Sequence, residues 1–355
     1  MDRAASLEQL SRLIGEEHII QGADEVSRND IRRKLEVYCF DCPLHTDDEV
    51  ARAHGYRLTP APGALIPLWT LQAYWSPGEP PLFGPGKPEK DGAPRARLPS
   101  TVFTSTVNAA AEVDYFEPVY PGDRLRSVTK LIEVKPKRSR LGEGVFLTMQ
   151  TSVSNQSGIV VCVRRNTSFH YDKRDQGSMP GEREPENRSD QAEDVQPPET
   201  PEVDWRRQLS FSEVRVGTQI PEYSVWLSYQ RIVMSVAVDR MFSGIHHNRD
   251  YARSIGLRDI IFNTRGYETI LEIMLRRWIG LEGSLKKFGP FRMVGSSHPG
   301  DTLVCGARVK ETLAAVPRGT VALELWVDSP RGRIAAGDAI VTLPLSARAM
   351  KEGSS

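Results

Sequence analysis

Hydrophobic positions recur at helical spacing between Thr264 and Ile279. They fall on one face of the predicted helix, at Tyr267, Ile270, Leu271, Met274 and Trp278. Gly280 follows directly and predicts the end of this helix. Residues 145–169 and 321–343 instead alternate apolar and polar side chains around a Gly-containing turn, which predicts pairs of antiparallel strands. A helix packed against a curved antiparallel sheet is an α+β arrangement.

The chain repeats itself. The segment PLHTDDEVARAHG at 43–55 matches GIHHNRDYARSIG at 244–256, with His and Gly ten residues apart in both. Further on, PVYPGDRL at 118–125 matches SSHPGDTL at 296–303. The interval from His to Pro-Gly-Asp is 23 residues longer in the first half, which is the length of the Pro/Gly-rich stretch 76–98. The sequence therefore predicts one structural unit used twice, with an insertion in the first copy.

A polar segment separates the two copies. Residues 172–204 contain no Leu, Ile, Phe, Tyr or Trp and have eleven acidic against four basic side chains. Such a segment buries too little apolar surface to fold, so we predict a flexible linker. The predicted units are 1–171 and 205–349. We expect their sheets to continue into one another as a pseudo-dimer, because this covers the free sheet edges.

Composition excludes several classes of protein. The 46 basic and 46 acidic residues cancel, which does not suit a nucleic-acid-binding protein. No run of 18 apolar residues occurs, so we expect no membrane span. The first 20 residues lack the apolar core of a secretory signal, and we expect a cytoplasmic protein. Cys39 and Cys42 form a single C-x-x-C without a second pair, so we expect no metal site.

The repeated motif resembles that of the MaoC-like (R)-specific enoyl-thioester hydratases and 3-hydroxyacyl dehydratases, which have the hotdog fold. The active half of that family carries G-D-x-N-P-[IL]-H, then A-x-x-x-G, a helix and a Pro-Gly-Asp strand. Pro43-Leu44-His45, Ile245-His246, both Ala-Arg-x-x-Gly runs and both Pro-Gly-Asp sites match it. The resemblance covers about 300 of the 355 residues. It implies a double hotdog, with two curved antiparallel sheets, each around a long central helix, fused in one chain.

The resemblance also implies an activity and a site. The reaction is reversible hydration of an enoyl thioester to a 3-hydroxyacyl thioester in fatty acid or polyketide metabolism, with CoA or an acyl carrier protein as carrier. The first half resembles the substrate-shaping partner, and the second half resembles the catalytic one. His246 is the catalytic histidine, and Asn263-Thr264 lies where the family places the donor that stabilises the thioester oxygen. No cofactor is needed beyond the carrier, and a homodimer is possible for such a pseudo-dimer.

The chain departs from the family at the catalytic acid. The family's Asp lies five residues before the His, where this chain has Met241 and Phe40. Asp239, seven residues before His246, becomes the predicted partner if a two-residue bulge moves it into place. The alternative pair is Asp41 with His45. We expect both Met241 and His247 to lie close to the substrate.

Two other functions stay open at this point. The missing acid at Met241 also suits a repurposed hotdog enzyme, such as an isomerase or cyclase that acts mainly by holding an acyl chain in a reactive conformation. A non-catalytic acyl-binding protein is the third possibility. The distance between a carboxylate and His246 separates these readings.

Overall fold

The structure is a computed structural model that describes residues 3–84, 101–103, 105–139, 142–172 and 202–346. The predicted linker 172–204 lies almost wholly outside these residues, and so does most of the predicted insertion 76–98. Within the described part of the chain, no helix combines the length and apolarity needed to cross a membrane.

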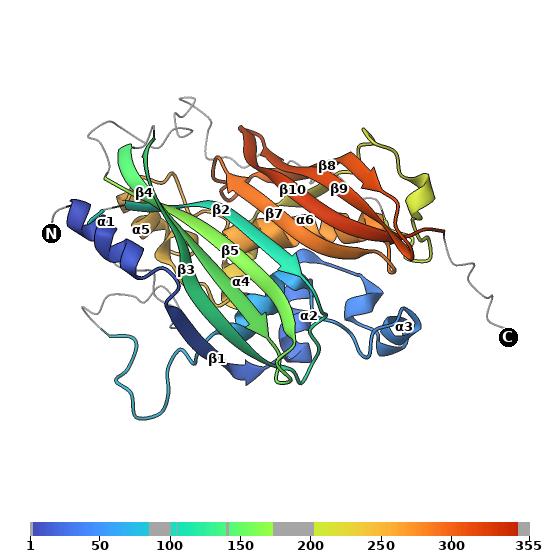
Figure 1. Cartoon of the computed structure of the whole chain (residues 1–355), viewed down its shortest axis with the longest axis horizontal. Coiled ribbons are helices and arrows are strands. Elements are labelled where there is room, and N and C mark those ends of the chain that lie inside the picture. The colour runs from blue at the N-terminus through green and yellow to red at the C-terminus, as the bar shows by residue number, and fades with distance from the viewer. Residues whose placement is uncertain (1–2, 85–100, 104, 140–141, 173–201, 347–355) are drawn as a thin grey trace.

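Ten antiparallel strands form one continuous sheet (Figure 1). The first unit contributes β1 (Glu17–Glu25), β2 (Ser105–Tyr115), β3 (Arg124–Ser139), β4 (Gly142–Ser154) and β5 (Val160–Tyr171). The second unit contributes β6 (Tyr223–Trp226), β7 (Ser284–Met293), β8 (Thr302–Leu313), β9 (Arg318–Ser329) and β10 (Gly332–Pro344). The strand order is β1-β3-β4-β5-β2-β7-β10-β9-β8-β6, so the two five-stranded halves meet where β2 pairs with β7. The predicted side-by-side pseudo-dimer is confirmed.

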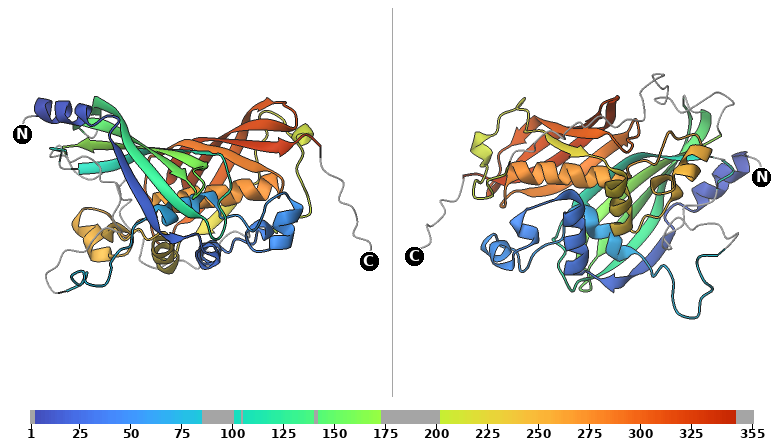
Figure 2. Two further views of the ribbon diagram at one scale, coloured as in Figure 1. Left: turned by 60° about the horizontal axis from the view of Figure 1, so that its bottom comes forward. Right: turned by 180° about the vertical axis from the view of Figure 1, so that it is seen from behind.

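The helices α2 to α6 lie on one side of this sheet (Figure 2). They are α2 (Arg28–Tyr38), α3 (Asp48–Ala53), α4 (Tyr229–Val238), α5 (Arg249–Ser254) and α6 (Thr264–Ile279). A separate helix, α1 (Arg3–Arg12), precedes β1, and short 3-10 turns η1 (Pro43–His45), η3 (Phe211–Glu213) and η4 (Gly244–His246) complete the elements outside the central segments. The α6 bounds and its C-cap at Gly280 match the sequence prediction.

The central segment of the first unit corrects one expectation. A long helix was expected in both units, but the first unit has only the 3-10 helix η2 (Gly63–Thr70) at this place. Pro67 lies inside it and Pro62 caps it. Because proline lacks the N–H that α-helical hydrogen bonding requires, this segment forms a short, tight helix instead. Among the residues that the structure describes, only the second unit therefore has a long central helix.

The internal repeat holds at the level of single hydrogen bonds. Val26 N–H donates to Asp123 O and Leu227 N–H donates to Asp301 O, each at 2.8 Å. Residues 26 and 227 are 201 positions apart, and this offset continues through both His segments. The glycines of both Pro-Gly-Asp turns have φ of +88°, which favours glycine over other residues.

Reciprocal polar contacts join α2 to the end of α4. Lys34 Nζ lies 2.7 Å from Asp239 Oδ1, and the hydroxyls of Tyr38 and Ser235 lie 2.9 Å apart. By the 201-residue offset, Lys34 corresponds to Ser235 and Tyr38 corresponds to Asp239. Each unit therefore offers the same two helix positions to the other, as a two-fold axis requires. All four side chains are buried.

Candidate active site

His246 is the central residue of the candidate site. It ends η4 and is 7% exposed, and its Nδ1 lies 2.8 Å from Ile261 O. Because a carbonyl oxygen only accepts, Nδ1 carries the hydrogen and a neutral ring keeps its lone pair on Nε2. Nε2 is therefore the nitrogen that can take up a proton.

His45 occupies the matching position in the first unit. Its Nδ1 lies 2.7 Å from Pro60 O, the same contact across the same 15 residues. Its ring packs against Phe40, with ring centroids 5.4 Å apart. Burial lowers the pKa of His45 to about 4, which keeps the imidazole neutral near pH 7. The backbone of the two His loops is thus the same, and their surroundings decide what each imidazole can do.

The turns before the two histidines have equal length. Phe40 N–H donates to Leu35 O at 3.0 Å, and Met241 N–H donates to Val236 O at 2.9 Å. The residues just before them, Cys39 and Arg240, both have positive φ, of 49° and 51°. The two-residue bulge that the pairing of Asp239 with His246 requires is therefore absent, because α4 simply ends at Asp239. Met241 stands at the position of the family's acid.

Asp239 lies in the interface between the units. It caps the C-terminus of α4 and is completely buried, with Oδ1 on Lys34 Nζ and Oδ2 without a hydrogen-bond partner among the described residues. The backbone oxygen of Asp239 accepts a hydrogen bond from Arg265 Nη1 at 3.3 Å. A catalytic role for Asp239 stays a prediction, and its contacts favour a role in holding α4 and α2 together.

The other predicted residues lie around the two loops. Asp41 is exposed on the first unit, next to the buried His45 segment. His247 Nε2 lies 3.0 Å from Phe242 O, so this ring is bound to its own loop. The Phe242 ring makes an edge-on contact with Tyr74, with centroids 5.5 Å apart. The first unit therefore contacts the loop that carries His246, and its substrate-shaping role stays a prediction.

Asn263 and Thr264 lie at the start of α6, two residues beyond the carbonyl that holds His246. Asn263 is the N-cap, and its Oδ1 accepts from Gly266 N–H at 2.5 Å. Its Nδ2 is buried and has no hydrogen-bond partner among the described residues. The structure thus brings His246 together with an unused amide donor and the positive end of a 16-residue helix.

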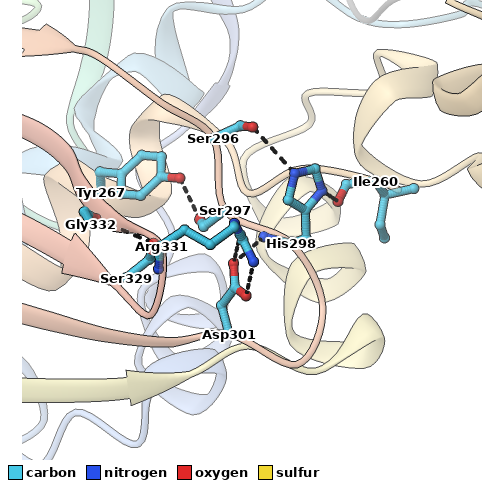
Figure 3. A network of polar contacts seen from close by, with 9 residues as sticks. All are labelled: Ile260, Tyr267, Ser296, Ser297, His298, Asp301, Ser329, Arg331 and Gly332. Atoms are coloured by element: carbon cyan, nitrogen blue, oxygen red, sulfur yellow. Dashed lines mark hydrogen bonds and ion pairs between the residues drawn. The ribbon is translucent and has the colours of Figure 1, made fainter. Parts of the chain in front are cut away.

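The loop of the second Pro-Gly-Asp motif supports this arrangement (Figure 3). Phe262 N–H donates to Ser297 O at 2.9 Å, and His298 Nδ1 lies 3.2 Å from Ile260 O. Asp301 is held in turn by the Arg331 guanidinium, with Nη1 2.8 Å from Oδ1. Sequence reasoning noted the motif but missed His298, whose position directly before Pro-Gly-Asp is the only local signal. Burial lowers the pKa of His298, so it acts as a neutral support.

Comparisons with known proteins agree with this architecture. Residues 12–164 match the family model "FAS1-like, dehydratase domain region". A "Probable enoyl-CoA hydratase alpha subunit" of Thermomonospora curvata is 30% identical over 159 residues, 44% of this chain and 47% of that protein. The chain thus spans about half the length of that relative. A "UPF0336 protein" of Saccharopolyspora erythraea is 29% identical over 154 residues, 43% of this chain and 86% of that protein.

Solved structures show the same fold over nearly the whole chain. A "MaoC-like dehydratase" superposes with a TM-score of 0.67 at 18% identity, covering 95% of this chain and all of the other. A Mycobacterium tuberculosis protein described as a double hotdog superposes with a TM-score of 0.60 at 11% identity, covering 94% and 97%. The fold is therefore the predicted double hotdog. The match of residues 12–164 to the dehydratase model and the similarity to the enoyl-CoA hydratase subunit support the predicted resemblance to the MaoC-like family.

Proposed function

We propose that the protein catalyses the reversible hydration of a 2-enoyl thioester to a 3-hydroxyacyl thioester at the second unit. The observation that supports this most strongly is the juxtaposition of His246 and the start of α6. His246 supplies one proton-handling nitrogen, fixed by the carbonyl of Ile261 at 2.8 Å. The start of α6 supplies donors for a thioester oxygen at Asn263 and Thr264.

One imidazole can handle both proton transfers of the dehydration. His246 Nε2 takes the α-proton of the 3-hydroxyacyl thioester, and the electron pair of that C–H bond moves toward the thioester carbonyl. Donors at the α6 N-terminus stabilise the resulting enolate oxygen. The C3–O bond then breaks, and the proton on Nε2 passes to the departing hydroxyl, which leaves as water. Hydration is the same sequence in reverse. The reaction as proposed uses no metal and no redox cofactor.

The sequence also predicts Asp239 as a proton-transfer group, whereas its contact with Lys34 favours a role in joining α4 to α2. The two roles differ in the expected effect of Asp239→Asn. If Asp239 transfers a proton, Asp239→Asn lowers turnover as strongly as His246→Ala, while Lys34→Met leaves the chemistry in place. If Asp239 only joins α4 to α2, Asp239→Asn and Lys34→Met both lower the free energy of unfolding. Turnover then falls only as far as the fraction of folded protein falls.

The test is turnover of enoyl-CoA substrates from crotonyl-CoA to longer chains, followed by the enoyl absorbance, with carrier-protein thioesters in parallel. His246→Ala should lower turnover by roughly 10²–10⁴-fold, which is the usual effect of removing a positioned general base. His45→Ala is the matched control, because it removes the same ring from the same loop of the first unit. No turnover on any substrate, or full activity in His246→Ala, would contradict the proposal.

A further inference from the structure

The helix α6 presents two acidic side chains, one turn apart, to the first unit. Glu268 accepts hydrogen bonds from Arg164 Nη2 in β5, at 2.8 and 3.0 Å. Glu272 lies one turn further along and reaches the start of η2. The central helix of the second unit is thus anchored in the first unit by two carboxylates.

Glu272 binds a donor pair in the manner of a bound anion. Its Oε1 accepts from Gly63 N–H at 2.7 Å, and its Oε2 accepts from Ala64 N–H at 2.8 Å. These are the first two N–H groups of η2, which has no earlier turn of its own to accept them. A carboxylate with one oxygen on each of two consecutive N–H groups fills the site that the start of a helix offers to an anion.

The surroundings of Glu272 are built for this contact. A methyl group on Gly63 would lie 2.7 Å from the Tyr115 ring, so glycine lets the start of η2 pack directly against this ring. Burial raises the pKa of Glu272, while the two N–H donors and the charges of Arg276 and Lys34 act in the opposite direction. Glu272 also lines a small pocket together with Lys34 and Tyr38 of α2.

The start of α6, which corresponds to the start of η2, has no carboxylate on its donors among the described residues. The 201-residue offset makes Asn263 the counterpart of Pro62, and Thr264 the counterpart of Gly63. Pro62 has no side-chain donor, whereas the buried Nδ2 of Asn263 is a donor without a partner among the described residues. No residue in the described ranges accepts a hydrogen bond from Thr264 N–H. The N–H donors at the start of η2 therefore bind the Glu272 carboxylate, whereas the Thr264 N–H and the Asn263 Nδ2 at the start of α6 have no such acceptor in the described part of the chain.

We propose that Glu272 closes the first unit, because its carboxylate occupies the two N–H donors at the place where the second unit binds the thioester oxygen. The chain then has a single site for a thioester, in the second unit. The corresponding donors of the first unit bind the carboxylate of Glu272 from α6. This inference deepens the proposed function, but its test measures stability and does not depend on turnover. Removing the Glu272 side chain should leave a cavity with two N–H donors that takes a small carboxylate.

The experiment measures thermal unfolding of the full chain with and without acetate. Glu272→Ala should lower the melting temperature by about 5–10 °C, because two buried donors lose their acceptor. Acetate should restore a large part of this loss in a saturable manner, whereas neutral acetamide should not. Glu272→Gln is the matched control: its amide fills the cavity, so acetate should have no effect on it. The wild-type protein should also not respond.

The inference is wrong if Glu272→Ala folds and acetate leaves its melting temperature unchanged. If Glu272→Ala does not fold, hydrogen exchange in Glu272→Gln decides the question. The amides of Gly63 and Ala64 are then expected to exchange faster than in the wild type, because one carboxylate oxygen has become an amide nitrogen. Unchanged exchange at both amides would overturn the inference. If the wild type does not hydrate any enoyl-CoA, that result contradicts the proposed function but not the contact of Glu272 with Gly63 and Ala64.

Discussion

The two His loops of this chain share a backbone and differ in their chemistry. Both imidazoles donate from Nδ1 to a carbonyl 15 residues later, at Pro60 O and Ile261 O. In the first unit the buried Phe40 ring packs on His45, and the helix start beyond it holds Glu272. In the second unit, the half-buried Met241 replaces Phe40, and the helix start keeps its donors. A few side chains around one shared loop therefore distinguish the buried His45 from His246, the imidazole that we propose to react.

The interface between the units shows a similar asymmetry. Two symmetry-related contacts join α2 and α4, but one is a buried ion pair and the other is a hydrogen bond between neutral hydroxyls. Breaking one partner of a buried ion pair leaves an uncompensated charge, whereas a lost neutral hydrogen bond costs much less. The two contacts thus occupy equivalent positions in the repeat, but we expect them to contribute differently to the free energy of unfolding.

Lys34→Met should have the largest effect on stability. It leaves the buried carboxylate of Asp239 without its cation, so we expect the free energy of unfolding to fall by about 3–5 kcal/mol. Tyr38→Phe, at the symmetry-related contact, should cost only about 1 kcal/mol. Urea unfolding of both variants measures the difference. Equal losses would show that the two contacts are energetically alike.

The pH dependence of stability should come next in size. The pKa of His45 is about 4 in the folded protein, below the 6.5 of an unperturbed histidine. As the pH falls from 6.5 toward 4, the unfolded chain takes up a proton at His45 that the folded chain does not, so stability falls by up to about 3 kcal/mol. His45→Gln should lose less stability than the wild type over this range. Parallel curves from urea unfolding at several pH values would be the contrary result.

Placing an acid at the family position should sharpen the difference between the loops. Met241→Asp puts a carboxylate five residues before His246 at a half-buried position, and we expect enoyl-CoA turnover to rise about tenfold or more through a second proton-handling group. Phe40→Asp makes the same change in the first unit and should give no gain in turnover per folded molecule. A gain in Phe40→Asp alone would assign the chemistry to the first unit.

The sequence predicts the features of the fold that depend on local patterns. The α6 helix has a clear apolar face and a glycine at its end, and the repeat carries matching His and Pro-Gly-Asp segments. The central segment of the first unit was mispredicted as a long helix. This segment corresponds to α6 in the repeat, so a long helix was expected. Pro67 cannot donate an α-helical hydrogen bond, and the segment forms a 3-10 helix instead.

The candidate site is predictable only in part, because several of its contacts are distant in sequence. His246 and the cap at Asn263 follow from local motifs. Lys34 is 205 positions from Asp239, and Glu272 is 208 positions from Ala64, so no local pattern indicates either contact. On the sequence alone, Glu272 is a polar position on an amphipathic helix. The tertiary arrangement turns it into the ligand of a second helix.

The central claim is that His246 moves the α-proton and His45 does not. Incubation of the 3-hydroxyacyl-CoA or enoyl-CoA substrate in D₂O, followed by NMR of the α-carbon, tests this directly. The account predicts deuterium at the α-carbon with the wild type and with His45→Ala, and roughly 10²–10⁴-fold slower incorporation with His246→Ala. Equal incorporation by the wild type and His246→Ala, or loss of incorporation in a folded His45→Ala, would contradict it.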